Sequence, residues 1–161
     1  MHAMVYQLFT EKMEKENWLD EDTLLQGDGS CYDWCSEISE DERKAAIIEL
    51  ATCILPAGMF RLIDSETLEY LGGMNEWKKS WVANIHRKAL GVNENNVMKL
   101  VEETYLLEKE IKNPLHTDSH FYLEGEGYQT FAEPSAELMR LVDDMKVGDR
   151  LYIGGIIDFH F

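Results

Sequence analysis

Leu151-Tyr152-Ile153-Gly154-Gly155-Ile156-Ile157-Asp158-Phe159 is the stretch that decides the fold. Its branched and aromatic residues predict a β-strand that ends the chain. Two shorter strand patterns precede it, Phe121-Tyr122-Leu123 and Tyr128-Gln129-Thr130-Phe131, on either side of Glu124-Gly125-Glu126-Gly127. A glycine turn between two such runs predicts a hairpin. The C-terminal third therefore predicts a small antiparallel sheet.

Helical spacing dominates the chain before Pro114. Amphipathic helices are expected over about residues 2–17, 40–54, 77–90 and 94–111, with a further helix after Pro134. A short helix is also expected after Asp64 or Ser65, and residues 59–63 fit either a strand or a helical turn. The resulting prediction is an α+β fold, in which a mostly helical N-terminal two-thirds packs with the C-terminal sheet.

Two of these helices carry more specific expectations. Ser39 and Glu42 form the Ser-x-x-Glu pattern of a capping box, which predicts the start of the helix that ends before Pro56. This helix is apolar around much of its circumference, so we place it at the centre of the core. Val97, Leu100, Val101, Thr104 and Leu107 are expected to face inward from the helix over 94–111.

Length and composition predict one domain, residues 1–161. With 45% apolar residues the chain can form a core, and no apolar run reaches the roughly 18 residues that a membrane helix needs. The 31 acidic residues against 15 lysines and arginines give a net charge of −16. This excess of acidic residues argues against direct binding to nucleic acid, because phosphate binding needs clustered basic residues.

The cysteines and the first residues bear on location. Cys31, Cys35 and Cys53 are an odd number in a chain large enough to form a core, which argues against a disulfide framework. The first residues show neither a basic region nor a long apolar stretch, so no secretory signal is expected. We therefore expect reduced thiols in the cytoplasm. No phosphate-binding or cofactor motif is present, and no cofactor is expected.

A cysteine follows a glycine turn in Gly27-Asp28-Gly29-Ser30-Cys31. If Cys31 opened a helix, the helix N-terminus would favour its thiolate, and a nucleophilic cysteine would also need a histidine base, for which His160 is the candidate. The stretch resembles the Asp-Gly-x-Cys nucleophile motif of OTU-type cysteine proteases, which remove ubiquitin. This resemblance implies a hydrolase whose site holds Asp28, Cys31 and His160. The competing interpretation is an ordinary turn followed by a small buried hydrophobe.

His116, Asp118 and His120 alternate along an extended segment, which would place them on one face. Two imidazoles and one carboxylate suit zinc or non-heme iron. The competing interpretation is a solvated loop after Asn113-Pro114, and we predict no metal site.

The distribution of charge supports the leading functional hypothesis. Residues 1–45 hold 12 acidic and 4 basic residues, and such a field speeds the association of a basic partner. Small acidic proteins of this kind include immunity proteins and phage inhibitors, so we expect a binding protein that blocks a basic surface of another protein. An alternative is that the charge only keeps the protein in solution. The expected contact residues are Trp18, Asp20, Glu21, Asp22, Asp28, Tyr32, Asp33, Trp34 and Glu37.

Overall fold

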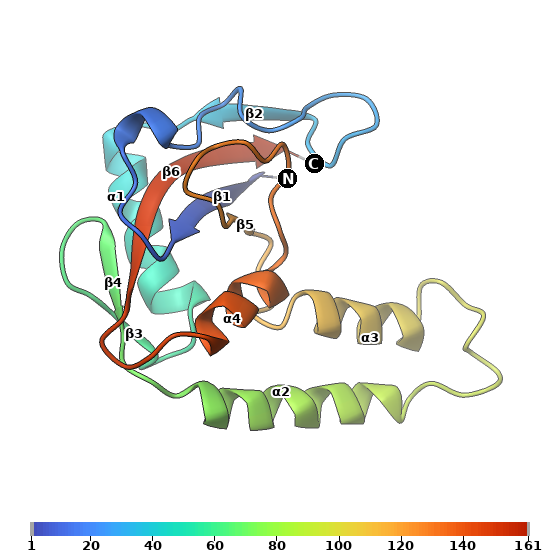
Figure 1. Cartoon of the computed structure of the whole chain (residues 1–161). Helices are drawn as coiled ribbons and strands as arrows, with labels where there is room; N and C mark the ends of the chain where they lie inside the picture. The colour runs from blue at the N-terminus through green and yellow to red at the C-terminus, as the bar shows by residue number, and fades with distance from the viewer. Residues whose placement is uncertain (1, 161) are drawn as a thin grey trace.

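The sheet is built around its longest strand, β6 (Arg150–His160), in a computed structural model that describes residues 2–160 (Figure 1). The strand order is β3-β4-β6-β1-β5, and β2 pairs with the end of β6. Since β1 runs along one edge of β6, β2 and β4 share the other edge, at opposite ends. The other strands are β1 (His2–Phe9), β2 (Trp34–Glu37), β3 (Phe60–Leu62), β4 (Thr67–Tyr70) and β5 (His120–Tyr122).

The sheet corrects the predicted division of the chain. Four of its six strands, β1 to β4, lie within the first 70 residues, so a mostly helical N-terminal two-thirds is wrong. The sheet is also mixed rather than antiparallel, because β5 pairs with β1 in parallel. The segment 128–131 forms no strand, and a loop replaces the expected hairpin. The protein is nevertheless α+β.

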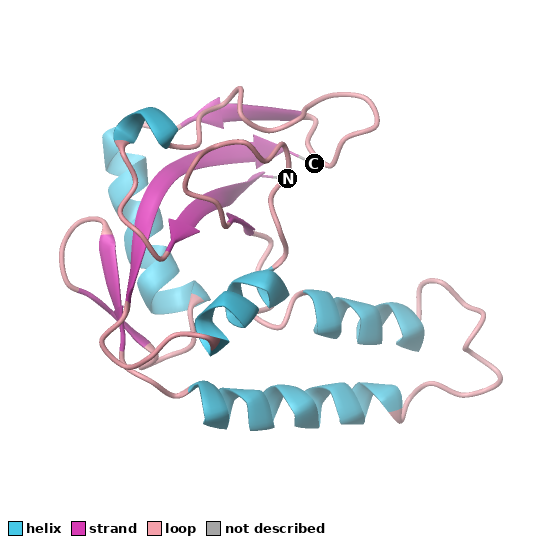
Figure 2. Cartoon of the chain, in the orientation of Figure 1, coloured by secondary structure: helices cyan, strands magenta, loops and turns pink. Residues whose placement is uncertain are grey.

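The helices are α1 (Glu40–Glu49), α2 (Met74–Ala89), α3 (Glu103–Lys112) and α4 (Ser135–Asp143), coloured cyan in Figure 2. A 3-10 turn, η1 (Lys15–Asn17), precedes β2, and a π-helical segment, η2 (Leu50–Ile54), extends α1. The capping box of Ser39 and Glu42 is confirmed at the start of α1. Among residues 2–160, no helix combines the length and the apolar composition needed to cross a membrane.

Residues 2–17 form no α-helix, and the burial of β1 explains the error. Val5, Tyr6, Gln7 and Leu8 are all buried, because the sheet is covered on both faces at this strand. A strand covered on both faces has no alternation of polar and apolar residues, so its pattern resembles that of a helix. The expected short helix at 65–72 is also wrong: the Asp64 carboxylate accepts from the Glu66 amide in the turn that leads into β4.

The two faces of the sheet are covered by different kinds of structure. One face packs against α1, η2 and α4, and this larger core includes Tyr6, Leu8 and Leu138. α1 covers this face rather than standing at the centre of the core. The opposite face includes Val5, Ile157 and Phe159, and it is covered by a loop that contributes Leu19, Leu24 and Tyr32.

Candidate binding face

The loop that covers the second face belongs to the acidic segment, which we define as residues 11–42. Leu19, Leu24 and Tyr32 are its buried anchors in the core behind it. Figure 1 places η1, β2 and the loop between them along the top of the molecule, opposite α2 and α3. The segment therefore exposes its acidic side chains on a base that is fixed to the sheet.

Gln7 ties the acidic segment to the sheet. Its buried side-chain amide donates to the carbonyls of Asn17 and Glu124 at 2.9 and 3.0 Å, and its oxygen accepts from the amides of Leu19 and Gly155 at 2.7 and 2.8 Å. The approach is close enough to exclude a side chain at Gly155, where a Cβ atom would lie 2.0 Å from the Leu19 carbonyl oxygen. Sequence analysis missed this arrangement, although the adjacent pair Gly154-Gly155 within a strand is a sign of close backbone approach.

Residues 21–26 of the segment also cover the free edge of β2. The outward amide of Cys35 donates to the Gln26 side chain at 2.5 Å, and that of Glu37 donates to Glu21 at 3.4 Å. Gln26 in turn donates to the carbonyl of Glu21. Because side chains occupy these donors, the edge offers little to an added strand, and a partner would meet side chains there.

Negative charge on the acidic segment is largely uncompensated. Of its twelve carboxylates, only Asp33 and Asp41 form an ion pair within residues 2–160, with His160 at 3.2 Å and with Lys44 at 3.7 Å. Asp20 instead stabilises a turn, accepting from the Asp22 amide and the Thr23 hydroxyl. Asp22, Asp28, Asp33 and Glu37 are all exposed.

The three expected aromatic contact residues have different environments. Trp34 is 40% exposed and stacks on His160, with 5.8 Å between ring centroids. Trp18 is half-buried, and the Arg43 guanidinium lies 4.4 Å from its ring centroid. Tyr32 is only 2% exposed, contrary to its expected place at the contact, and burial raises its pKa to about 12. Only Trp34 combines exposure with a fixed position.

The residues of the expected thiol site are only partly brought together. Cys31 is exposed in a loop and does not open a helix, since α1 begins at Glu40. His160 bonds to Asp33 rather than to Asp28, and within the described chain no hydrogen bond joins it to the Cys31 thiol. Burial, followed by the charge of Asp158, raises the pKa of the Cys35 thiol to about 11.

His116, Asp118 and His120 do not converge. His116 bonds to Glu110 at 2.9 Å, whereas His120 contacts the Tyr32 hydroxyl at 3.1 Å on the sheet. Burial of His120 lowers its pKa, partly opposed by Asp118. Residues 2–160 contain no group of three potential ligands placed to hold a metal ion.

A second His–Asp pair was not foreseen. His2 Nδ1 lies 2.8 Å from the Asp158 carboxylate, and the His2 ring meets both Trp34 and His160 edge-on. These residues come from three neighbouring strands, so only the strand pairing of β1, β2 and β6 reveals their contact. His2 and His160 hold the ring of Trp34 in place within the acidic segment.

Comparison of the chain with protein-family models, with curated proteins and with solved structures finds no match.

Proposed function

We propose that this protein is an acidic binding protein of the cytoplasm that occupies a basic surface of a partner protein and thereby blocks it. The observation that carries the proposal is the set of ten carboxylates in the acidic segment that form no ion pair with another described residue. Uncompensated charge on one side of a protein speeds association with a surface of opposite charge.

The firm attachment of the segment supports the same function. A loop that must become ordered on binding loses affinity to the entropy of ordering. Here Gln7 and the buried Tyr32 already fix the loop against the sheet. Its carboxylates are therefore presented from an ordered base, as a binding surface requires.

Trp34 is the proposed apolar anchor of the contact. Tryptophan is enriched among residues that dominate binding energies, and its ring here is held by His2 and His160. Burying this fixed ring costs less side-chain entropy than burying a mobile one.

The experiment compares two variants with equal changes of charge. Asp22, Asp28 and Glu37 are exposed and use no carboxylate oxygen in an internal hydrogen bond, so replacing all three with Lys changes the charge of the segment alone. The control replaces Glu94, Glu126 and Asp144, exposed acids outside the segment, with Lys.

Nuclease-treated cell extract is passed over each immobilised protein at low salt. We expect the wild type and the control to retain a basic protein that the segment variant does not retain. With that protein purified, association with the wild type should slow steeply as salt rises. Equal retention by the two lysine variants would contradict the proposed surface.

A cysteine-dependent hydrolase is the second candidate, supported by the exposed Cys31 thiol and by the pairing of His160 with Asp33 at 3.2 Å. In this candidate His160 would deprotonate Cys31 after a local movement of the loop, with Asp33 rather than Asp28 orienting the imidazole. It predicts rapid alkylation of Cys31 by iodoacetamide near neutral pH, with a large loss of rate in His160→Ala. Slow labelling in both proteins would exclude it.

A further inference from the structure

The part of the molecule opposite the acidic segment exposes many apolar side chains. α2, α3 and the loop between them form an arm, residues 74–113, that runs away from the sheet (Figure 1). Eighteen large apolar side chains are exposed among residues 2–160, and nine of them lie in the arm, which is a quarter of the chain. The most exposed lie in the loop at the end of the arm, which we call the tip: Leu90 (87%), Met98 (88%), Leu100 (86%) and Val101 (84%).

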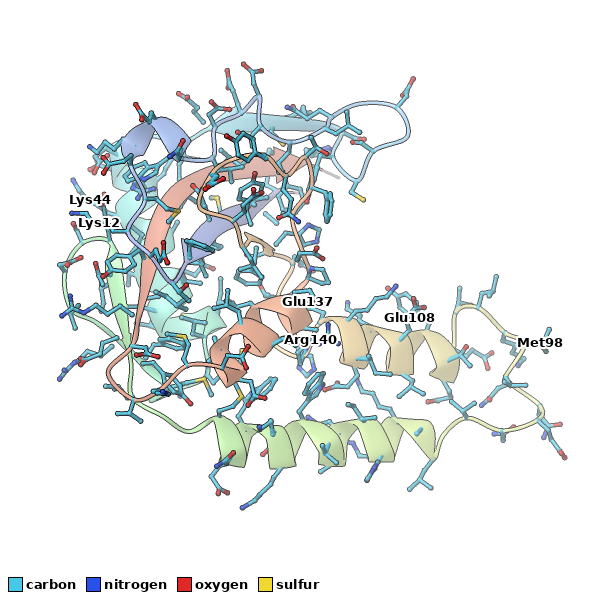
Figure 3. All side chains as sticks on the ribbon, viewed as in Figure 1. Lys12, Lys44, Met98, Glu108, Glu137 and Arg140 are labelled. Atoms are coloured by element: carbon cyan, nitrogen blue, oxygen red, sulfur yellow. The ribbon has the colours of Figure 1, made fainter. Side chains whose placement is uncertain are left out.

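The tip is an ordered loop. The side chain of Asn96 donates to the Gly91 carbonyl at 2.8 Å and accepts from the Asn93 amide at 2.8 Å, while Asn93 accepts from the Asn95 amide. Figure 3 shows Met98 at the far end of the arm, away from the sheet. These polar bonds hold the loop without burying its apolar residues, so their burial requires a second molecule.

The expectation that Val97, Leu100 and Val101 face inward from a helix is therefore wrong. That helix, α3, begins only at Glu103, and residues 94–102 form turns. The apolar side chains of this region therefore lie on the surface and not in the core.

Charge on the arm is balanced, unlike charge on the rest of the molecule. The arm holds seven basic and six acidic residues, whereas the remaining chain holds 8 basic and 25 acidic residues. Four of the six acids are paired within the arm, the most buried being Glu110, whose carboxylate lies 2.8 Å from Lys88 Nζ. The arm consequently offers apolar surface with almost no net charge.

We propose that the tip is a contact between two copies of this chain, which meet tip to tip about a two-fold axis. In such a contact each surface faces itself. A surface that carries charge of one sign repels a second copy of itself. A surface that binds an oppositely charged partner is itself expected to be charged. A nearly neutral apolar tip with both signs of charge nearby, such as Lys99 and Glu102, fits a second copy.

The length of the arm makes this association compatible with the charge of the molecule. α2 has 16 residues, which corresponds to roughly 24 Å. This is about three Debye lengths at physiological ionic strength. Two tips can therefore meet while the acidic remainders of the two chains stay largely screened from each other. The dimer would carry one acidic segment at each end.

Sedimentation equilibrium of the full chain tests the proposal. The wild type should reach the mass of two chains as its concentration rises into the micromolar range. Met98→Ser/Leu100→Ser should weaken dimerisation roughly 100-fold, because each substitution counts twice in a two-fold contact. The matched control is Leu25→Ser/Val147→Ser, two exposed apolar residues outside the arm, which should leave the dissociation constant within about two-fold.

Disulfide crosslinking tests the orientation of the two copies. In a Cys31→Ser/Cys53→Ser background, Met98→Cys should form an intermolecular disulfide with diamide as the oxidant, and Val147→Cys should not. A wild type that remains monomeric would overturn the proposal. So would equal weakening by the tip and control variants. Monomeric protein that binds phosphatidylcholine vesicles through the tip would also overturn it, in favour of a lipid surface.

Discussion

The acidic segment and the arm are both long segments of the chain, but they leave different groups without partners. The segment buries its apolar anchors, including Leu24 and Tyr32, and leaves ten carboxylates without an ion pair in the described chain. The arm pairs most of its acids and leaves nine large apolar side chains exposed, among them Met98 and Leu100. This difference is the basis of the two contacts that we propose, one electrostatic and one apolar, at opposite ends of one molecule.

The largest expected effect comes from a substitution that breaks the attachment of the acidic segment to the sheet and leaves the arm intact. Gly155→Ala would place a Cβ atom 2.0 Å from the Leu19 carbonyl oxygen, so the loop must move. We expect a loss of about 3 kcal/mol of unfolding free energy, measured by urea denaturation. Amide exchange should accelerate over residues 17–33 and stay unchanged in α2.

Gly148→Ala is the control for this prediction. Gly148 has a φ of 95° and open space around its Cβ position, so alanine there adds backbone strain without a clash. Its cost should be about 1 kcal/mol. Equal destabilisation by the two substitutions would show that the close approach at Gly155 is unimportant.

The next effect weakens the arm alone. Glu110 is 1% exposed and accepts from Lys88 and His116 at 2.8 and 2.9 Å. Glu110→Gln removes the negative charge of the acceptor from these bonds and should cost about 1 to 2 kcal/mol of unfolding free energy in urea denaturation. Faster amide exchange should be confined to α2 and α3. Faster exchange in β6 would contradict the separation of the two regions.

Acid should affect the arm through Glu110. Burial raises the pKa of this carboxyl, but the bonds from Lys88 and His116 outweigh burial and leave the pKa below its ordinary value of 4.5. The stability that this residue contributes is therefore fully present above pH 4.5 and is lost as pH falls below it. Amide exchange of α3 from pH 6 to 3.5 measures this loss, which Glu110→Gln should remove.

A smaller effect, at pH values nearer neutrality, comes from His120, which lies in the sheet rather than in the arm. Burial lowers the pKa of His120 below 6.5, so the unfolded chain binds a proton here more readily than the folded one. The contribution is fully present above pH 6.5 and is lost as pH falls below it. Unfolding free energy measured from pH 7.5 to 5 should fall less in His120→Gln. An unchanged slope would contradict this role.

The smallest effect on stability comes from the acidic side chains. Asp22→Lys/Asp28→Lys/Glu37→Lys should change the unfolding free energy by less than about 0.5 kcal/mol, because these exposed carboxylates make no internal hydrogen bond. The same variant should slow association with a basic partner. A stability loss comparable with that of Gly155→Ala would assign these side chains to the fold rather than to binding.

Local sequence patterns predict the structure correctly where neighbouring residues determine it. The capping box at Ser39, the helix over α2 and the final strand β6 follow from short-range signals, and all three are confirmed. β1 was mistaken for a helix because burial on both faces hides its alternation. The parallel pairing of β5 with β1 joins residues more than a hundred positions apart, which no local pattern reveals.

The candidate site was predictable in its charge but not in its geometry. Counting residues located the acidic segment, whereas the burial of Tyr32 and the support of Trp34 by His2 depend on the fold. The tip of the arm was assigned to the core because apolar spacing alone does not show whether another element covers it. Asn93, Asn95 and Asn96 in this region were a sign of turns.

The most direct test of the contrast between the two ends is the salt dependence of the dimer. Sedimentation equilibrium is measured at about 10 and about 150 mM NaCl. The Debye length falls from roughly 30 to 8 Å between these two concentrations, a range that includes the length of the arm. An apolar contact between neutral tips should tighten as salt rises, because screening reduces repulsion between the two acidic bodies. A dimer that weakens with salt would contradict the account, since attraction between charges would then hold it together.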